Sequence, residues 1–297
     1  MASMPSAYHS LFVVFAVLFG ATVGSFLNVC IYRLPRECLS IVWPGSHCPA
    51  CQRPIRWFEN IPLLSYAALR GRCRGCGGRI PLRYPLVEGL TAALFGLAAW
   101  MQAARVTPGT LPDAIVVFSE QAFILSLLVV ATFIDLDHRI IPAELTRWPM
   151  WLAPAVAAIF PALHAPFAGA PLEQLARISP RLAGASASLL GIAAGLGIVY
   201  AVRVFGGILF RREAMGLGDV WYLGMLGGYL GWKGALLVFI TACFFGALIG
   251  GLIWLLTGDR TMAFGPYLSL AAGVVLLFRP ALLDGIARYA DWVRGMT

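Results

Sequence analysis

Two aspartates, Asp135 and Asp219, occur where the surrounding sequence is strongly apolar. Asp135 lies in "ATFIDLDHRIIP", at the end of one apolar run, and Asp219 lies in "MGLGDVWYLG", at the start of another. Two carboxyl groups brought together cannot both ionise, so one keeps a proton while the other can activate water. Such a pair would supply the general base and the general acid of aspartyl peptide hydrolysis.

The residues around these acids bear on whether the acids have a catalytic role. Gly216 and Gly218 would let a substrate backbone approach Asp219 closely and would let the start of a helix unwind. An acid at the end of a helix can also be there simply because water solvates it. We prefer this solvated interpretation for Asp137 and His138, and the functional one for Asp135 and Asp219 taken together.

Four of the seven cysteines form two Cys-x2-Cys pairs, Cys48 with Cys51 and Cys73 with Cys76. This spacing is typical of a tetrahedral zinc site made of four thiolates. Four thiolates leave zinc no open position, so the metal would fold the loop rather than catalyse a reaction. A reduced or redox-active tetrad is the alternative, and a reducing cytoplasm disfavours disulfides.

The composition indicates an integral membrane protein. Of 297 residues, 60% are hydrophobic and only 12% are charged, and the mean hydropathy is +0.80. A soluble domain cannot bury that much apolar side chain. The first apolar stretch, residues 8–31, predicts a retained transmembrane helix rather than a signal peptide, because no basic region precedes it.

Continuous apolar runs of about 20 residues predict transmembrane helices rather than barrel strands. Eight spans are expected, at about 8–30, 84–104, 114–134, 148–164, 184–205, 219–232, 235–256 and 262–280. The sequence thus predicts an all-α polytopic membrane protein with a cytoplasmic zinc-binding loop. Its parts are a first transmembrane helix (1–30), the loop (31–83) and a seven-helix membrane domain (84–297).

Charge predicts the orientation. The 31–83 segment carries nine arginines against Glu37 and Glu59, so the positive-inside rule places it in the cytoplasm. With eight spans, both termini would then be periplasmic. The formal net charge of +8 follows from this topology and gives no reason to expect a nucleic-acid partner.

An ordered set of motifs resembles the bacterial type IV prepilin peptidases, which are intramembrane aspartyl proteases of the GxGD type. The matching stretches are "GSFLNVCIYRLP" (24–35), "HCPACQRPIRWFENIPLLSY" (47–66), "GRCRGCGGRIPLRYPLVEG" (71–89), "FIDLDHRIIP" (133–142), "MGLGD" (215–219) and "FGPYLSLA" (264–271). They extend over nearly the whole chain in the order of the family.

The resemblance implies a bifunctional enzyme of the bacterial inner membrane. It would cut the short basic leader from prepilins or pseudopilins of type IV pili or type II secretion systems at the cytoplasmic face, with Asp135 and Asp219 as the catalytic pair. It would then methylate the new N-terminus with S-adenosylmethionine. No Rossmann-type glycine loop is present. The methyltransferase activity is therefore expected in the zinc-binding loop (31–83) and its flanks, and the residues that bind the methyl donor stay unknown.

Two positions depart from the pattern of the family. Trp221 stands where a lysine is usual, and Ala143 followed by Glu144 stands where an aspartate usually follows the proline. Neither position belongs to the proposed catalytic pair. A catalytically altered scaffold, whose zinc loop docks secretion or pilus machinery, is therefore one alternative. A transporter with a proton relay is another, although the acids cluster at one face and no inverted repeat is seen.

Overall fold

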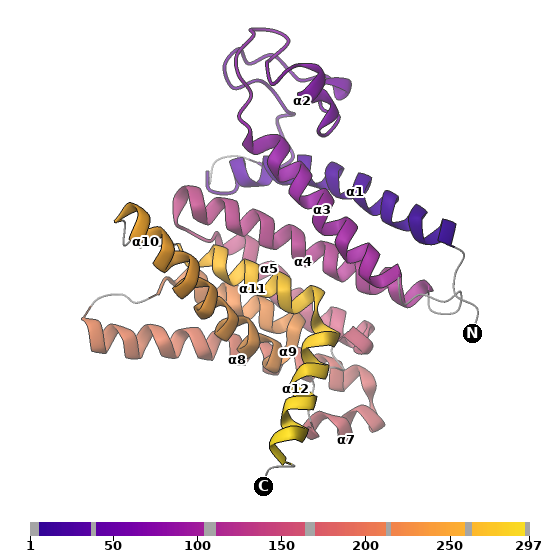
Figure 1. Cartoon of the computed structure of the whole chain (residues 1–297), viewed down its shortest axis with the longest axis vertical. Coiled ribbons are helices and arrows are strands. Elements are labelled where there is room, and N and C mark those ends of the chain that lie inside the picture. Colours follow the sequence, from indigo (N-terminus) through magenta and orange to yellow (C-terminus); the bar gives the residue numbers. More distant parts are fainter. Residues whose placement is uncertain are drawn as a thin grey trace. The chain divides into compact units, whose positions relative to one another are not determined.

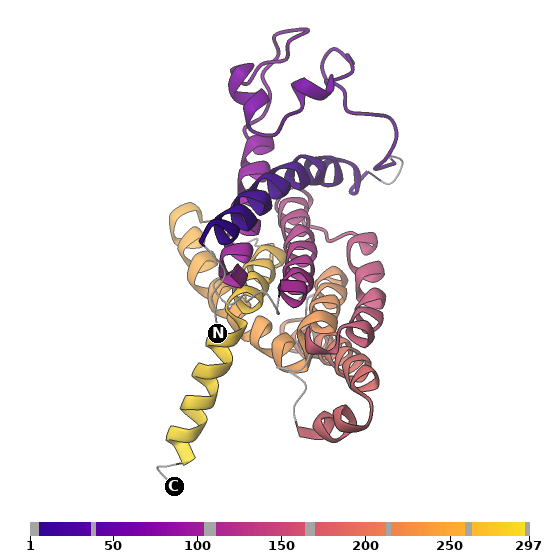
Figure 2. The same cartoon turned by 90° about the vertical axis from the view of Figure 1, so that its right-hand side faces the viewer.

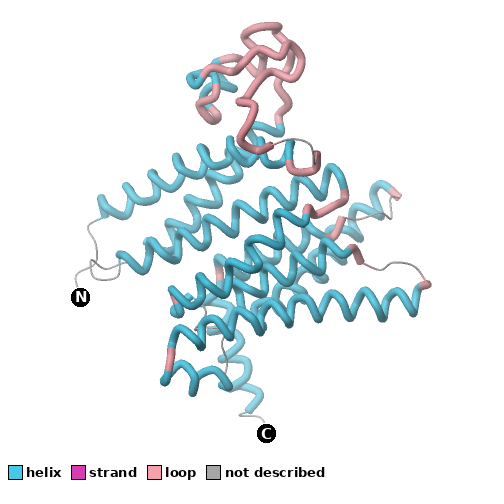
Figure 3. Tube along the Cα trace, turned by 180° about the vertical axis from the view of Figure 1, so that it is seen from behind, coloured by secondary structure: helices cyan, strands magenta, loops and turns pink. Residues whose placement is uncertain are grey.

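The computed structural model describes residues 6–36, 40–103, 111–163, 170–211, 215–258 and 263–294. Within these ranges helices are joined by turns and loops, and no strand is present (Figure 3). The predicted all-α class is confirmed. The chain divides into two compact units, Met1–Ile134 and Asp135–Thr297. The predicted division at residues 30 and 83 stays a prediction.

The first unit is built on close packing between two helices. Its elements are α1 (Ser6–Arg33), η1 (Trp57–Glu59), α2 (Leu64–Ala68), α3 (Arg83–Ala103) and most of α4 (Leu111–His138). Helices α1 and α3 lie side by side (Figures 1 and 2). A Cβ on Gly20 would lie 2.9 Å from the Ala92 Cα, and one on Gly24 would lie 2.7 Å from the Glu88 Cα. This GxxxG spacing lets the two backbones approach where a larger residue would separate them.

Aromatic rings complete the helical core of this unit. Phe118 of α4 lies edge-on to Phe12 of α1 and to Phe95 of α3, with ring centroids 5.3 and 6.0 Å apart. Phe19 adds a tilted contact to Phe95 at 6.0 Å. Edge-to-face pairs of this kind add to the stabilisation from burial. The long loop that carries η1 and α2 extends beyond the ends of α1 and α3 (Figures 1 and 2).

The second unit also depends on the close approach of two helix backbones at glycine residues. Its elements are α5 (Ala143–Ile159), η3 (Pro161–Leu163), α7 (Ala170–Ile178), α8 (Pro180–Phe210), α9 (Leu217–Phe245), the π-helix η4 (Gly246–Gly250), α10 (Gly251–Thr257), α11 (Gly265–Leu277) and α12 (Arg279–Arg294). A Cβ on Gly191 of α8 would overlap the carbonyl oxygen of Gly227 on α9, and the reverse holds for Gly227. Ser188 donates to the Gly228 carbonyl at 2.7 Å and fixes the same contact.

Helix α9 bends sharply at Gly231, whose φ of 69° and ψ of 174° are not helical. A Cβ on Gly227 would lie 3.3 Å from the Ala235 Cβ. An unbroken helix separates residues eight apart by about 12 Å. The bend therefore divides α9 into two arms, which correspond to the predicted spans 219–232 and 235–256.

The predicted count of eight spans is not confirmed. In the described ranges, five helical segments are long and apolar enough to cross a membrane: Tyr8–Arg33, Arg83–Gln102, Leu111–His138, Pro180–Leu209 and Leu217–Thr257. Helix α5 overlaps the predicted span 148–164, and α11 lies within the predicted span 262–280, but their 17 and 13 residues are fewer than the roughly 20 that a bilayer needs. Between the predicted spans 148–164 and 184–205, residues 165–169 lie outside the described ranges, and α7 follows them.

The glycine contact between α8 and α9 can be tested with two glycines of one helix. We expect Gly191→Ala to lower the free energy of unfolding by about 1–3 kcal/mol, because the added methyl group overpacks the interface. Gly197→Ala is the matched control, since a Cβ there meets no atom within 4 Å. Thermal unfolding in detergent measures both. Equal midpoints for the two variants would contradict the packing described.

Candidate active site and metal centre

Asp135 is positioned by the end of a helix. It lies in the last turn of α4 and is 5% exposed. Arg139 ends that helix with a left-handed φ of 56°, and its N–H donates to the Asp135 carbonyl at 2.9 Å. The chain then turns through Ile141 into α5. The end of α4 therefore holds the Asp135 side chain within the second unit.

Asp219 is positioned by the start of a helix. It occupies the first turn of α9, and its Oδ2 accepts the N–H of Gly216, the residue that caps the helix, at 3.3 Å. An acid in this position also interacts favourably with the helix dipole. This contact involves one carboxylate oxygen, Oδ2.

The structure brings the two predicted acids together. The Asp135 and Asp219 carboxylates are near enough for their charges to interact, and Gly218 and Gly265, which adjoin them, both pack against Ile141. A Cβ on Gly218 would lie 3.2 Å from the Ile141 Cβ, and a Cβ on Gly265 would lie 3.2 Å from the Ile141 Cδ1. The small size of Gly218 thus serves packing against Ile141. The predicted role of Gly216 and Gly218 in substrate approach stays a prediction.

A hydrogen-bonded chain from α11 supports the pair, and sequence reasoning missed it. The N–H of Gly265 donates to Asp135 Oδ2 at 3.0 Å, and a Cβ at Gly265 would lie only 2.6 Å from that oxygen. Ser269 donates to the Gly265 carbonyl at 2.9 Å and lies 2.8 Å from the hydroxyl of the fully buried Tyr222. Tyr222 follows Asp219 by three residues, a spacing that places both on one helix face and is visible in the sequence.

Trp221, the residue that departs from the resemblance, faces a cation from another helix. The guanidinium carbon of Arg147 on α5 lies 5.1 Å from the centroid of the Trp221 ring. Cation–π contacts form at such distances. The tryptophan thus connects the N-terminal part of α9 to α5.

The four predicted cysteine ligands meet in the long loop of the first unit. Their sulfur atoms all lie within 4.8 Å of one another, with Cys48 and Cys76 at 3.9 Å and Cys51 and Cys73 at 4.0 Å. Sulfurs around a tetrahedral zinc at Zn–S distances of about 2.3 Å are separated by about 3.8 Å. The arrangement could therefore hold zinc.

The two Cys-x2-Cys turns have the same backbone structure. The N–H of Cys48 donates to the Arg53 carbonyl, and the N–H of Cys73 donates to the Gly78 carbonyl, at 2.9 and 2.8 Å. Gln52 and Gly77 follow the second cysteine of each turn and share a left-handed φ of 58° and 70°. Backbone N–H groups of Cys76 and Gly75 lower the pKa of the Cys73 thiol to about 6, so this ligand is available as the thiolate that metals bind.

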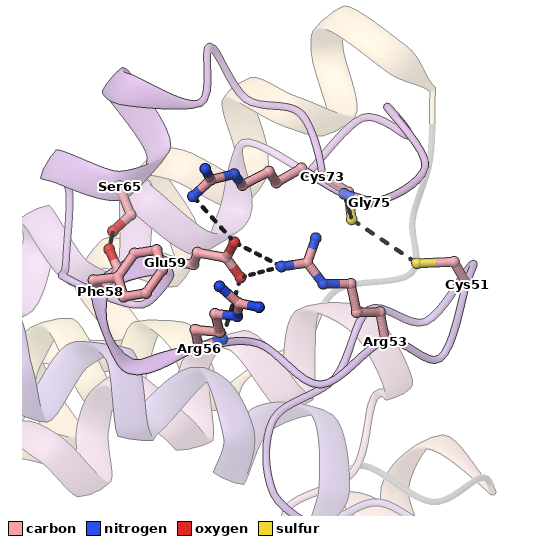
Figure 4. Close-up of polar contacts among 9 residues, drawn as sticks. Cys51, Arg53, Arg56, Phe58, Glu59, Ser65, Cys73 and Gly75 are labelled. Atoms are coloured by element: carbon pink, nitrogen blue, oxygen red, sulfur yellow. Dashed lines mark hydrogen bonds and ion pairs between the residues drawn. The ribbon is translucent and has the colours of Figure 1, made fainter.

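Glu59 connects the two turns (Figure 4). Arg53 of the first turn lies 2.8 Å from Glu59 Oε1, and Arg74 of the second lies 3.7 Å from the same oxygen. The N–H of Arg56 donates to Glu59 Oε2 at 3.2 Å. This N–H contact, with the two guanidinium groups, lowers the pKa of Glu59. The acid is thus ionised at neutral pH and neutralised by arginines.

A pocket of about 420 Å³ lies between this loop and the adjoining ends of α1 and α3. Cys48 and Cys73 contribute to its wall, so it borders the cysteine tetrad. Its other lining residues include Asn28, Tyr84 and Glu88. Among these, Asn28 is 4% and Glu88 is 8% exposed. Sequence reasoning gave Glu88 no role, although an acid within an apolar helix is a signal of function.

Fold and sites define an all-α membrane protein with a paired aspartate site in one unit and a four-cysteine centre in the other. Two family models match this chain: the bacterial peptidase A24 N-terminal domain at residues 18–102, and the type IV leader peptidase family at residues 122–251. The chain belongs to the type IV leader peptidase family.

Similar proteins support this membership. A prepilin leader peptidase/N-methyltransferase of Myxococcus xanthus is 41% identical, over 86% of this chain and 67% of the relative. Proteins of the same name from Aeromonas hydrophila and Pseudomonas aeruginosa are 35% and 32% identical, over 96% and 98% of this chain and 94% and 98% of the relatives. No solved structure matches the chain.

The contact between Gly265 and Asp135 predicts a sensitive position outside the motifs of the two acids. We expect Gly265→Ala to lower prepilin cleavage at least about tenfold, because the new methyl group displaces the Asp135 carboxylate from its geometry. Gly251→Ala is the control, since a Cβ there meets no atom within 4 Å. Cleavage rates in detergent measure both. Full activity of Gly265→Ala would show that this contact does not position Asp135.

The cysteine tetrad predicts one bound zinc per chain. We expect Cys73→Ser to weaken zinc binding at least about tenfold, because it removes one of the four thiolates. Cys243→Ser removes an exposed cysteine outside the tetrad and should leave the metal content unchanged. Metal analysis of the purified proteins measures both. A Cys73→Ser protein that retains full zinc at limiting metal would exclude the four-thiolate site.

Proposed function

We propose that this protein removes the leader of type IV prepilins or pseudopilins with Asp135 and Asp219, and then methylates the new N-terminus. The peptidase proposal rests on one observation. These two acids lie close together in one unit, and the N–H of Gly265 donates a hydrogen bond to the Asp135 carboxylate. The names of the relatives supply the substrate class and the second activity.

The geometry supports a general acid–base mechanism. One carboxylate takes a proton from water, and the water oxygen attacks the carbonyl carbon of the scissile peptide bond. The other carboxyl group donates its proton, and the carbon–nitrogen bond breaks to release the new amino terminus. Gly265 and Gly216 hold one oxygen of each acid, so the two groups need little rearrangement on reaction.

Zinc in the cysteine tetrad would have a structural role in this proposal. All four ligands are protein thiolates, so no coordination position is left for a substrate. The metal would fix the two cysteine turns and thereby shape the neighbouring pocket wall, to which Cys48 and Cys73 contribute. Metal binding of this kind contributes directly to folding.

The residues around the pocket fit S-adenosylmethionine as methyl donor. Its volume of about 420 Å³ lies within the range of roughly 300–1,000 Å³ found for small-molecule sites. Tyr66 and Tyr84 contribute to its lining, and aromatic faces attract cations such as a sulfonium. When bound, the donor supplies an electrophilic methyl group.

Localisation in the inner membrane, with the cysteine loop in the cytoplasm and both termini periplasmic, is part of the proposal. The five apolar segments support the membrane location, and the arginines of the loop support its cytoplasmic side. The periplasmic termini rest on the predicted even number of spans. The alternative of a catalytically altered scaffold is not favoured, because the relatives are named prepilin leader peptidase/N-methyltransferase and Trp221 replaces neither acid.

Removing either acid should separate the two activities. We expect Asp135→Asn and Asp219→Asn each to lower leader cleavage by about 10²–10⁴-fold, because each loses a proton-transfer group. Methylation of a substrate that is already cleaved should continue in both variants. Cleavage is measured on a full-length prepilin in liposomes, and Asp113→Asn, which changes an exposed acid of α4, is the control. Wild-type cleavage by either dyad variant would refute the assigned pair.

A further inference from the structure

Glu88 is a buried acid that the peptidase mechanism does not use. Only 8% exposed, it accepts the N–H of Leu63 on Oε2 at 2.8 Å and a side-chain hydrogen bond from Ser25. In the described part of the chain, no basic side chain forms an ion pair with it. Burying a carboxylate without a cation is costly, and a cationic ligand would offset that cost.

Glu59, the other acid in the pocket lining, differs from Glu88 in its charged neighbours. Glu59 also lines the pocket, but Arg53 and Arg74 neutralise it. The nearby Arg33 guanidinium is occupied by the Ser40 and Pro44 carbonyls, at 2.7 and 2.6 Å. Glu88 is therefore the acid of this lining that a positively charged ligand would find uncompensated.

Asn28 places a second acceptor in the same pocket. Its amide nitrogen donates to the Tyr84 carbonyl at 3.1 Å and to the Gly24 carbonyl at 3.3 Å. Both amide hydrogens are used in this way, so the Oδ1 carbonyl is the group that can accept from a ligand. Gly24, whose Cβ would clash with the Glu88 backbone, allows α1 and α3 to bring both acceptors to one pocket.

We propose that Glu88 and Asn28 bind the α-ammonium group of the cleaved pilin, and that Glu88 takes the proton that this group must lose before methylation. The proposal deepens the methyltransferase function and rests on it. An ammonium group offers three donors and one positive charge, which match a carboxylate and a neutral carbonyl oxygen.

The reaction balances with Glu88 as the base. The ammonium group passes one proton to the Glu88 carboxylate and becomes a neutral amine. The nitrogen lone pair then forms a bond to the methyl carbon, and the bond from that carbon to the donor sulfur breaks with its electron pair left on sulfur. The product is a protonated secondary amine, and Glu88 releases its proton to water.

Binding without methyl donor tests the site directly. The probes are two fluorescent peptides with the N-terminal sequence of the cleaved pilin, one with a free amine and one N-acetylated. At pH 7 the wild-type protein should bind the free-amine peptide at least about tenfold more tightly, because the ion pair with Glu88 is buried. Glu88→Gln should lose this preference, and Asp113→Asn should keep it.

Methylation rates give a second readout. At pH 7 we expect Glu88→Gln to lower kcat/KM for methylation at least about tenfold, and at pH 9 less than about threefold, because a free α-amine with a pKa of about 8 is then mostly neutral. Leader cleavage by Glu88→Gln should equal that of the wild type and shows that the variant is folded. A Glu88→Gln protein that keeps the peptide preference, or methylates normally at pH 7, would overturn the proposal.

Glu88→Asp provides the test if Glu88→Gln does not fold. It retains the negative charge and should retain the preference for the free amine, so a folded Glu88→Asp protein that binds both peptides equally would also overturn the proposal.

Failure of the methyltransferase function can be distinguished from failure of the ammonium site. Wild-type protein that prefers the free amine but transfers no methyl group would refute that function and leave the ammonium site standing. Wild-type protein that methylates without such a preference would refute the ammonium site alone.

Discussion

Close approach of helix backbones at glycine is the constraint on which both units depend. In lipid, helices gain little from hydrophobic association, so packing and hydrogen bonds must hold them together. Gly20 and Gly24 allow this between α1 and α3, and Gly191 and Gly227 allow it between α8 and α9. A larger residue at these positions would separate α1 from α3, which carry Asn28 and Glu88, and α8 from α9, which carries Asp219.

The polar groups follow from this packing. In the second unit, the Asp135 carboxylate, the Gly265 backbone, Ser269 and Tyr222 form one hydrogen-bonded chain between α4, α11 and α9. Each polar group in this chain forms a hydrogen bond with the next one, which reduces the free-energy cost of burying it among apolar helices. The same contacts hold the Asp135 carboxylate in place, so packing and the geometry of this acid have the same physical basis.

The loop of the first unit is stabilised in a different way. It has no strands and only short helical turns in its described residues, so it cannot build a large apolar core. Four cysteines and the Glu59 ion pairs connect its two turns instead. Because the tetrad borders the pocket that contains Glu88, metal-dependent folding and the proposed methyl transfer are physically connected. The peptidase acids lie in the other unit, which is consistent with two separable chemistries on one chain.

The sequence by itself determined the features that are local or compositional. Hydropathy gives the membrane class, the two Cys-x2-Cys spacings give the tetrad, and the motifs around Asp135 and Asp219 give the candidate acids. The break between the predicted spans 219–232 and 235–256 agrees with the bend at Gly231. The number of spans was not determined, because an apolar run does not show where its helix begins and ends, and α5 and α11 have only 17 and 13 residues. Only the tertiary structure placed Gly265 against Asp135, and brought Glu88 and Asn28 into one pocket in which no described arginine forms an ion pair with Glu88. These relations join residues on different helices, so they depend on how the helices pack and not on any local pattern.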